Sequence, residues 1–148
     1  MNDLFDIEDR QAILDRIDRL TPTTQRHWGR MDVAQMMAHC AFPLEQAVAG
    51  RARQRLIGRI LGPFARKKML SEAPFNRNSP TDPDFKVADP REFAVEKTRL
   101  LAAIEAFVQR GRAQIARSVH PFFGRLSGGD WGWLMFKHID HHLRQFGA

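Results

Sequence analysis

The sequence predicts an all-α protein, a four-helix bundle in which one long irregular connection separates the second helix from the third. Apolar residues recur with helical spacing in four stretches, and no stretch shows the alternating pattern of a β-strand convincingly. The 148 residues match the usual size of one domain, so we expect a single domain over residues 1–148. With 43% hydrophobic residues, the chain can fill one globular core.

The first two helices are predicted over residues 7–20 and 32–49. Isoleucine and leucine at helical spacing indicate the first helix, which Pro22 and the residue before it end. Asp32 is a suitable N-cap for the second helix, because a glutamine follows three positions later. Pro43 lies inside this second helix and is expected to kink it or shift its hydrogen bonding.

The third helix has a strong start signal, with Asp89 as N-cap, Pro90 at the first helical position and Glu92 at the third. It is predicted to continue to about Gln109, just before Gly111. Its expected core residues are Phe93, Leu100, Leu101, Ile104 and Phe107.

The fourth helix is predicted to run from Ser127, whose capping partner is Asp130, almost to the C-terminus. A short connection over residues 116–127 brings it back beside the third helix. Residues 71–90, by contrast, are typical of an extended loop, because asparagine, serine and threonine accompany Pro74, Pro80, Pro83 and Pro90. A loop of this length in a small domain is usually functional or packed across the surface.

The formal net charge is +6, and residues 51–68 hold seven basic residues and no acidic one. Such a run attracts phosphate or an anionic membrane surface, although a solvated surface with counterions is the favoured interpretation. Leucine, isoleucine and phenylalanine within residues 56–69 further indicate a short amphipathic helix packed on the bundle.

Several features predict a cytoplasmic protein without a membrane span. No stretch approaches the roughly 18 to 20 apolar residues that a spanning helix needs. The N-terminus is acidic and has no signal-peptide pattern. Cys40 is the single cysteine, so an internal disulfide is excluded.

The fourth helix carries a pair of histidines, His138 and His142, whose spacing of four lets both imidazoles reach one metal ion. Both fall on the apolar stripe of the helix. That stripe also contains Trp131, Leu134, Met135 and Gln145, whereas the residues expected to face solvent are Lys137, Asp140 and Arg144. For the pair alone, hydrogen bonds to neighbouring side chains are the simpler explanation.

A third histidine changes that balance. His39 lies on the inward stripe of the second helix, with Met36, Phe42 and Gln46. Three inward imidazoles from two helices supply three coordination positions and leave others for water or substrate. We therefore predict a divalent metal site formed by His39, His138 and His142.

Other residues of these helices receive lesser roles. His141 is a candidate donor to the ligands or an alternative ligand, and Gln145 is placed to hold a ligating imidazole or a water. Cys40 is interpreted as a buried small apolar residue. His27 and His120 are expected to be surface or packing residues, although the turn that His120 begins is a candidate cover for the site.

These motifs resemble the DinB/YfiT-like superfamily of proposed metalloenzymes, and more closely a DinB-related branch of unassigned function. The resemblance runs from about residue 28 to residue 147. It is carried by Trp28-Gly29-Arg30-Met31, Met37-Ala38-His39-Cys40, His120-Pro121-Phe122-Phe123-Gly124 and His138-x-x-His141-His142-x-x-Gln145.

The resemblance implies an up-down-down-up bundle, often dimeric, with a three-histidine metal site that maps onto His39, His138 and His142. Characterised members of the superfamily include S-transferases and an isomerase that use low-molecular-weight thiols, and other members have been proposed as hydrolases. No substrate follows from this resemblance for the present chain.

The leading hypothesis is therefore a metal-dependent transferase or hydrolase that acts, as a homodimer, on a small molecule such as a low-molecular-weight thiol. Zinc, nickel and iron all suit imidazole ligands, and no residue is assigned as catalytic. The alternative is a non-catalytic module that uses residues 51–68 to bind nucleic acid or an anionic membrane. Nucleic acid is the weaker choice, because no helix-turn-helix or aromatic-interleaved basic strand is evident. A third hypothesis keeps the metal and makes it structural.

Overall fold

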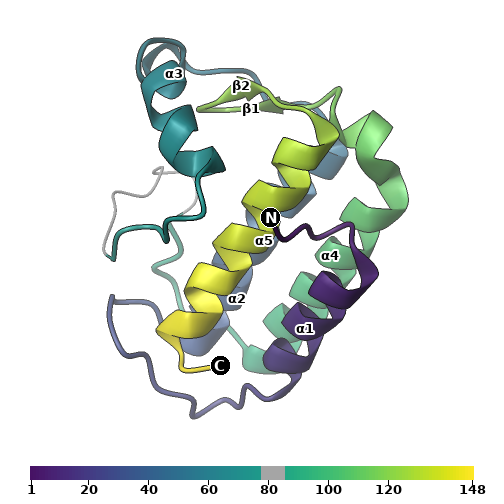
Figure 1. Cartoon of the computed structure of the whole chain (residues 1–148). Coiled ribbons are helices and arrows are strands. Elements are labelled where there is room, and N and C mark those ends of the chain that lie inside the picture. The colour runs from purple at the N-terminus through teal and green to yellow at the C-terminus, as the bar shows by residue number, and fades with distance from the viewer. Residues whose placement is uncertain (78–85) are drawn as a thin grey trace.

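A computed structural model describes residues 1–77 and 86–148, which form five helices and one small antiparallel hairpin (Figure 1). The all-α prediction is thus confirmed in its broad form. The elements are α1 (Ile7–Asp18), α2 (Val33–Ala49), α3 (Leu56–Leu70), α4 (Phe93–Ile115), β1 (Val119–His120), β2 (Gly124–Arg125) and α5 (Gly128–Gln145).

Four of the helices share the main core. The most extensive helix pairing is between α2 and α4, and α5 contacts α1, α2 and α4. Helix α3 lies at one end of the molecule, beside the hairpin (Figure 1). With a fifth helix and a hairpin present, the specific DinB-like four-helix bundle stays a prediction. No helix in the described ranges is long and apolar enough to cross a membrane.

Local capping sets the ends of α2 and the start of α5, as predicted. The Asp32 carboxylate accepts from the backbone N–H of Gln35, whose side chain accepts from the N–H of Asp32. Ser127 and Asp130 form the same reciprocal pair at the start of α5. Helix α2 ends at the left-handed Gly50 and continues through Pro43 without interruption.

The predicted start of the third long helix is wrong. Helix α4 has Glu92 as its N-cap position and begins at Phe93, so Asp89 is not the cap. The Asp89 carboxylate instead pairs with Arg91 at 3.0 Å. Its backbone carbonyl accepts from the Gln35 side chain of α2 at 3.0 Å, which holds this segment as an extended connection between helices.

The end of α4 also lies beyond the predicted Gln109. Helical structure reaches Ile115, but Gly111 adopts a non-helical conformation with φ 76° and ψ 154°. The glycine therefore produces a kink at the predicted end, and a further turn follows it. Of the five expected core residues, Leu100, Ile104 and Phe107 are fully buried, and Phe93 and Leu101 are partly buried.

The connection over residues 116–127 contains strands that the sequence pattern did not predict. β1 and β2 pair antiparallel, with Val119 opposite Arg125 and His120 opposite Gly124. The Nδ1 atom of His120 accepts from the backbone N–H groups of Phe122 and Phe123, both at 3.1 Å. This histidine thus organises its own turn.

Helix α3 confirms the predicted helix but contradicts its predicted packing. Its buried residues are Gly58, Gly62 and Met69. Five of its large apolar side chains are exposed instead, namely Leu56, Ile57, Ile60, Leu61 and Phe64. The reason is steric, because only the glycine face fits against the hairpin. After α3, residues 71–77 and 86–90 form neither helix nor strand, as expected, while Pro80 and Pro83 lie outside the described residues.

Lys137 is likewise misplaced by the sequence prediction, which put it in solvent. The residue is only 4% exposed. Its Nζ donates to the carbonyl oxygens of Lys68, Met69 and Ser71 at 3.2, 3.1 and 2.6 Å. The ammonium group thus caps the C-terminal end of α3 and ties it to α5. Asp140 is also partly buried, in an ion pair with Arg16 at 2.7 Å, whereas Arg144 is exposed as predicted.

Candidate metal centre

Three imidazole rings meet where α2 and α5 contact each other. His39 comes from α2, and His138 and His142 come from successive turns of α5. The Nε2 atoms of His39 and His138 are 2.9 Å apart, and the ring centroids of the three pairs are 4.7 to 4.9 Å apart. One nitrogen from each ring lies within 4.8 Å of the others. The sequence prediction that these three side chains converge is confirmed.

The separations suit a shared ion. Two nitrogens bonded to one zinc-like ion at about 2.0–2.1 Å lie roughly 2.8 to 3.4 Å apart for ordinary coordination angles. The His39–His138 distance of 2.9 Å falls in this range. The three ligand nitrogens lie within 4.8 Å of one another, so side-chain rotation is needed for all three to bind one ion. The donor set therefore fits a divalent metal, although a hydrogen bond between two neutral rings also accounts for the closest pair.

Gln145 fixes which nitrogen of His142 faces the cluster. The Gln145 amide nitrogen donates to the carbonyl of Trp28 at 2.7 Å, so its oxygen Oε1 points the other way. That oxygen lies 2.8 Å from Nδ1 of His142. Because an amide oxygen can only accept, Nδ1 carries the proton and Nε2 is left with a lone pair for a ligand.

A tight turn at Gly29 leaves room for the Gln145 side chain in this arrangement. Gly29 has a φ of 83°, a left-handed conformation that favours glycine. A side chain at this position would collide with the Gln145 amide. The backbone N–H of His27 donates to the carbonyl of Gln145 at 2.7 Å, which adds a second tie between the loop and α5. The loop before α2 thus helps to orient a histidine on α5.

Burial lowers the pKa of two of the clustered histidines, His138 and His142. It is the main cause that holds the pKa of His138 well below its usual value, with His39 and His142 adding like-charge repulsion. Burial followed by the charge of His39 lowers the pKa of His142 to about 3, despite the hydrogen bond to Gln145. A neutral imidazole is the form that binds metal.

The cluster retains access to the surface. His39 is buried, but His138 and His142 are partly exposed. His141 is also partly exposed, and its ring lies against Trp28, Phe75 and His142, with centroids 5.9, 5.8 and 5.1 Å away. Burial is the main cause that lowers the pKa of His141. The structure gives His141 an aromatic packing position next to the three-histidine cluster.

The sequence did not indicate two residues that lie beside the three-histidine cluster, Phe75 and Arg77. Phe75 packs on His141, and the Arg77 guanidinium lies 4.4 Å from the centre of the Trp28 ring. Both belong to the irregular segment after α3, where no periodic pattern indicates which side chains turn inward. In the sequence, only the family motif at residues 28–31 points to Trp28. A group of aromatic side chains, with the exposed Arg77 guanidinium beside it, therefore lies next to the three histidines.

The remaining histidines and Cys40 fall outside the cluster. His27 is exposed, and His120 is buried in the hairpin, close enough to His138 to influence its pKa. Cys40 is fully buried, as predicted, and burial raises the pKa of its thiol well above the usual range. A buried thiol with a raised pKa is a poor nucleophile.

No buried carboxylate is available to the cluster as a base among the described residues. Glu96 is the buried acidic side chain of that part of the chain, and it pairs with Arg91 and Arg99 at 3.2 and 3.3 Å. Arg99 also binds Glu45 of α2 through two hydrogen bonds of 2.7 Å. This ion network joins α2 to α4 and has a structural role.

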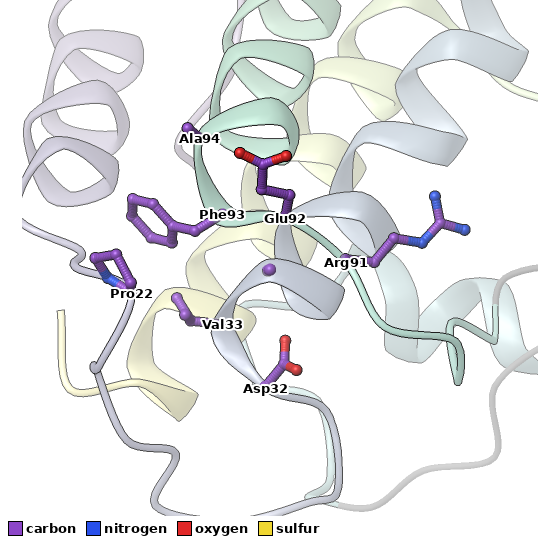
Figure 2. A pocket seen from close by; sticks show the side chains of 8 residues that line it. Pro22, Asp32, Val33, Arg91, Glu92, Phe93 and Ala94 are labelled. Atoms are coloured by element: carbon purple, nitrogen blue, oxygen red, sulfur yellow. The ribbon is translucent and has the colours of Figure 1, made fainter.

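A hollow at the other end of α2 from Gly50 contains no cluster of metal-binding side chains comparable to the three histidines. Figure 2 shows it between the loop after α1 and the first turns of α2 and α4. Two of its polar groups are already engaged, because Asp32 caps α2 and Arg91 pairs with Asp89 and Glu96. None of the three clustered histidines lines it; the lining residues are Pro22, Asp32, Val33, Ala34, Arg91, Glu92, Phe93 and Ala94.

Fold and site define a mainly helical protein with a three-histidine cluster capable of holding a metal ion. Over residues 1–148 the chain matches the family described as "Protein of unknown function (DUF1569)", and it belongs to that family. DUF1569 is a DinB-like family, so the resemblance is confirmed at this level, without an activity. No curated protein and no solved structure shows a significant match.

Proposed function

We propose that this protein is a metal-dependent enzyme in which His39, His138 and His142 hold one divalent ion. The observation that carries the proposal is the convergence of three imidazoles from two helices, with Nε2 atoms of His39 and His138 2.9 Å apart. Two of the three residues, His138 and His142, are partly exposed, which supports access of a small molecule to the centre.

The ligand number supports a catalytic rather than a structural ion. Structural zinc sites are typically closed by four protein ligands, whereas catalytic sites keep a position open. Within the described residues, the cluster comprises the three histidines and no cysteine or carboxylate. When bound, the ion would supply Lewis-acid chemistry that lowers the pKa of a water or a thiol.

The protein's own side chains would orient the metal ligands and bind the substrate. Gln145 accepts from Nδ1 of His142 and leaves Nε2 of this ring for a metal, and burial lowers the pKa of His138 and His142. Trp28, Phe75 and His141 offer aromatic contact area beside the cluster, and Arg77 offers a positive charge. These features suit a small organic substrate with an anionic group. By the family resemblance, the reaction would be a transfer that depends on a low-molecular-weight thiol, or a hydrolysis. The enzyme would act as a homodimer in the cytoplasm.

The proposal is tested by replacing one ligand and measuring bound metal. The purified protein should contain about one ion per chain by elemental mass spectrometry after metal reconstitution. His138→Ala should reduce this to near zero, because two imidazoles alone bind a divalent ion weakly. His27→Ala is the matched control, since His27 is exposed and outside the cluster.

Full metal content in His138→Ala would reject the assignment and favour a plain hydrogen bond between His39 and His138. Circular dichroism of the same variant separates the two roles of a metal. Retained helicity without metal agrees with an open catalytic site. Unfolding of the variant would identify the ion as structural.

A further inference from the structure

Helix α3 presents an unpartnered apolar face to solvent. The exposed fractions of its large apolar residues are 75% for Leu56, 58% for Ile57, 68% for Ile60, 47% for Leu61 and 81% for Phe64. These five form most of the large exposed apolar residues of the described chain, and they share two and a half turns of one helix. A contiguous apolar face of this kind marks an interaction site.

The outward orientation of this face is built into the packing. A Cβ added at Gly58 would lie 2.5 Å from the carbonyl oxygen of Phe122, and one at Gly62 would lie 2.6 Å from the same oxygen. Only these two glycines allow α3 to rest on the hairpin backbone. Rotating the helix to bury Ile60 or Phe64 would drive larger side chains into that backbone, so the apolar residues must face solvent.

Contacts at both ends hold α3 in this orientation. Before the helix, the N–H of Arg55 donates to the carbonyl of Pro121 at 2.9 Å, and the Gln54 amide donates to that of Phe122 at 3.2 Å. At its end, Lys137 binds three carbonyls, and Arg66 pairs with Asp130 at 3.0 Å. The apolar face is therefore a fixed surface of the folded protein.

The charged residues in the segment that carries this face are of one sign. Seven basic residues and no acidic one lie between residues 51 and 68. Arg66 is partly exposed and pairs with Asp130, and the other six are exposed, namely Arg51, Arg53, Arg55, Arg59, Lys67 and Lys68. A second copy of the same face would bring two sets of positive charges together, which opposes self-association. A partner that complements this region must therefore offer both negative charge and an apolar layer.

We propose that α3 and the basic residues before it dock this protein onto an anionic lipid surface. The helix would lie in the membrane interface, its apolar face inserted among the acyl chains and its basic rim on the headgroup phosphates. Nucleic acid offers phosphates to the same rim but no apolar layer for Ile60 and Phe64. The combination of charge with exposed aliphatic and aromatic side chains favours lipid.

The test is sedimentation of the full-length, metal-reconstituted protein with vesicles. Binding is expected to vesicles of phosphatidylcholine and phosphatidylglycerol at 3:1, and to be at least tenfold weaker with phosphatidylcholine alone. The double variant Ile60→Ser/Phe64→Ser should weaken binding at least tenfold. Its matched control is Ile7→Ser/Val95→Ser, which removes two exposed apolar residues elsewhere and should bind as the parent does.

A second pair of variants tests the basic rim. Arg59→Gln/Lys67→Gln/Lys68→Gln should weaken binding to the anionic vesicles and reduce its salt dependence. The triple variant Arg19→Gln/Arg110→Gln/Arg117→Gln removes three exposed charges outside residues 51–68 and should have a much smaller effect. Circular dichroism and metal content identical to the parent show that each variant is folded.

Three outcomes would overturn the proposal. Absence of binding to the anionic vesicles by the folded parent is the first. A dimer in light scattering that Ile60→Ser/Phe64→Ser dissociates would assign the face to a second copy instead. Binding to duplex DNA that survives this double substitution, without vesicle binding, would assign the basic rim to nucleic acid.

Discussion

Helices α5 and α3 depart from the usual distribution of polar and apolar residues in opposite ways, α5 by placing polar residues inward and α3 by placing apolar residues outward. Helix α5 places His138 and His142 against His39 of α2 and buries Gln145 next to His142, at positions where most helices place aliphatic residues. Helix α3 turns Ile60 and Phe64 to solvent and packs Gly58 and Gly62 inward. In both helices, contacts with neighbouring backbone or side chains fix these orientations, so they are features of the folded structure. The two proposed functional regions are where the ordinary rule fails.

Two leucines test the first consequence of this difference, which is that the main core and α3 contribute very unequally to stability. Leu44→Ala in α2 removes a fully buried side chain and should lower the free energy of unfolding by about 2–5 kcal/mol. Leu56→Ala in α3 removes a side chain that is 75% exposed and should change it by less than about 0.5 kcal/mol. Urea denaturation followed by circular dichroism measures both. Similar losses for the two variants would show that α3 is buried in solution.

Two glycines test whether close packing on the hairpin orients α3. Gly58→Ala places a Cβ against the Phe122 carbonyl and should cost about 1–3 kcal/mol, with metal content unchanged. Gly129→Ala is the control, because its Cβ would meet no atom closer than 3.9 Å, and it should be neutral or slightly stabilising. Denaturation curves of both variants give the comparison. Equal stability of the two would contradict the close approach of α3 to the hairpin.

Gln145 tests how strongly the inward polar face of α5 depends on its supporting contacts. Gln145→Leu removes the acceptor for His142 Nδ1 and the donor to Trp28, so metal affinity should fall about 10- to 100-fold while stoichiometry is retained. Competition with a chelator of known affinity measures the change. Gln114→Leu replaces an exposed glutamine and serves as the control. An unchanged affinity in Gln145→Leu would mean that the His142 ring is oriented by packing alone.

Local sequence signals predicted several helix ends well. The reciprocal pairs Asp32–Gln35 and Ser127–Asp130 involve residues three apart, so their geometry follows from the helix itself. The same reasoning failed at Asp89, whose carboxylate and carbonyl are taken by Arg91 and by Gln35 of another helix. A cap is therefore predictable only where no other group, near or distant in the sequence, competes for it.

The metal ligands were predictable for a similar reason. His138 and His142 are four residues apart, and their place on the apolar stripe of α5 follows from helical geometry. His39 required the further assumption that α2 and α5 face each other, which the family resemblance supported and the structure confirms. Phe75 and Arg77 could not be found in this way, because the segment after α3 has no regular period.

By itself, the sequence determined the helical class, the capped ends of α2 and the start of α5, and the side of each helix on which the three histidines lie. These properties depend on residues within about one turn of each other. The tertiary structure alone decided that Lys137 is buried, that α4 begins at Phe93 and that the apolar face of α3 points outward. The burial of Lys137 and the orientation of α3 depend on distant backbone carbonyls, such as that of Phe122 beneath Gly58, and the segment before α4 is held by the Gln35 side chain of another helix. No local pattern encodes the positions of these groups.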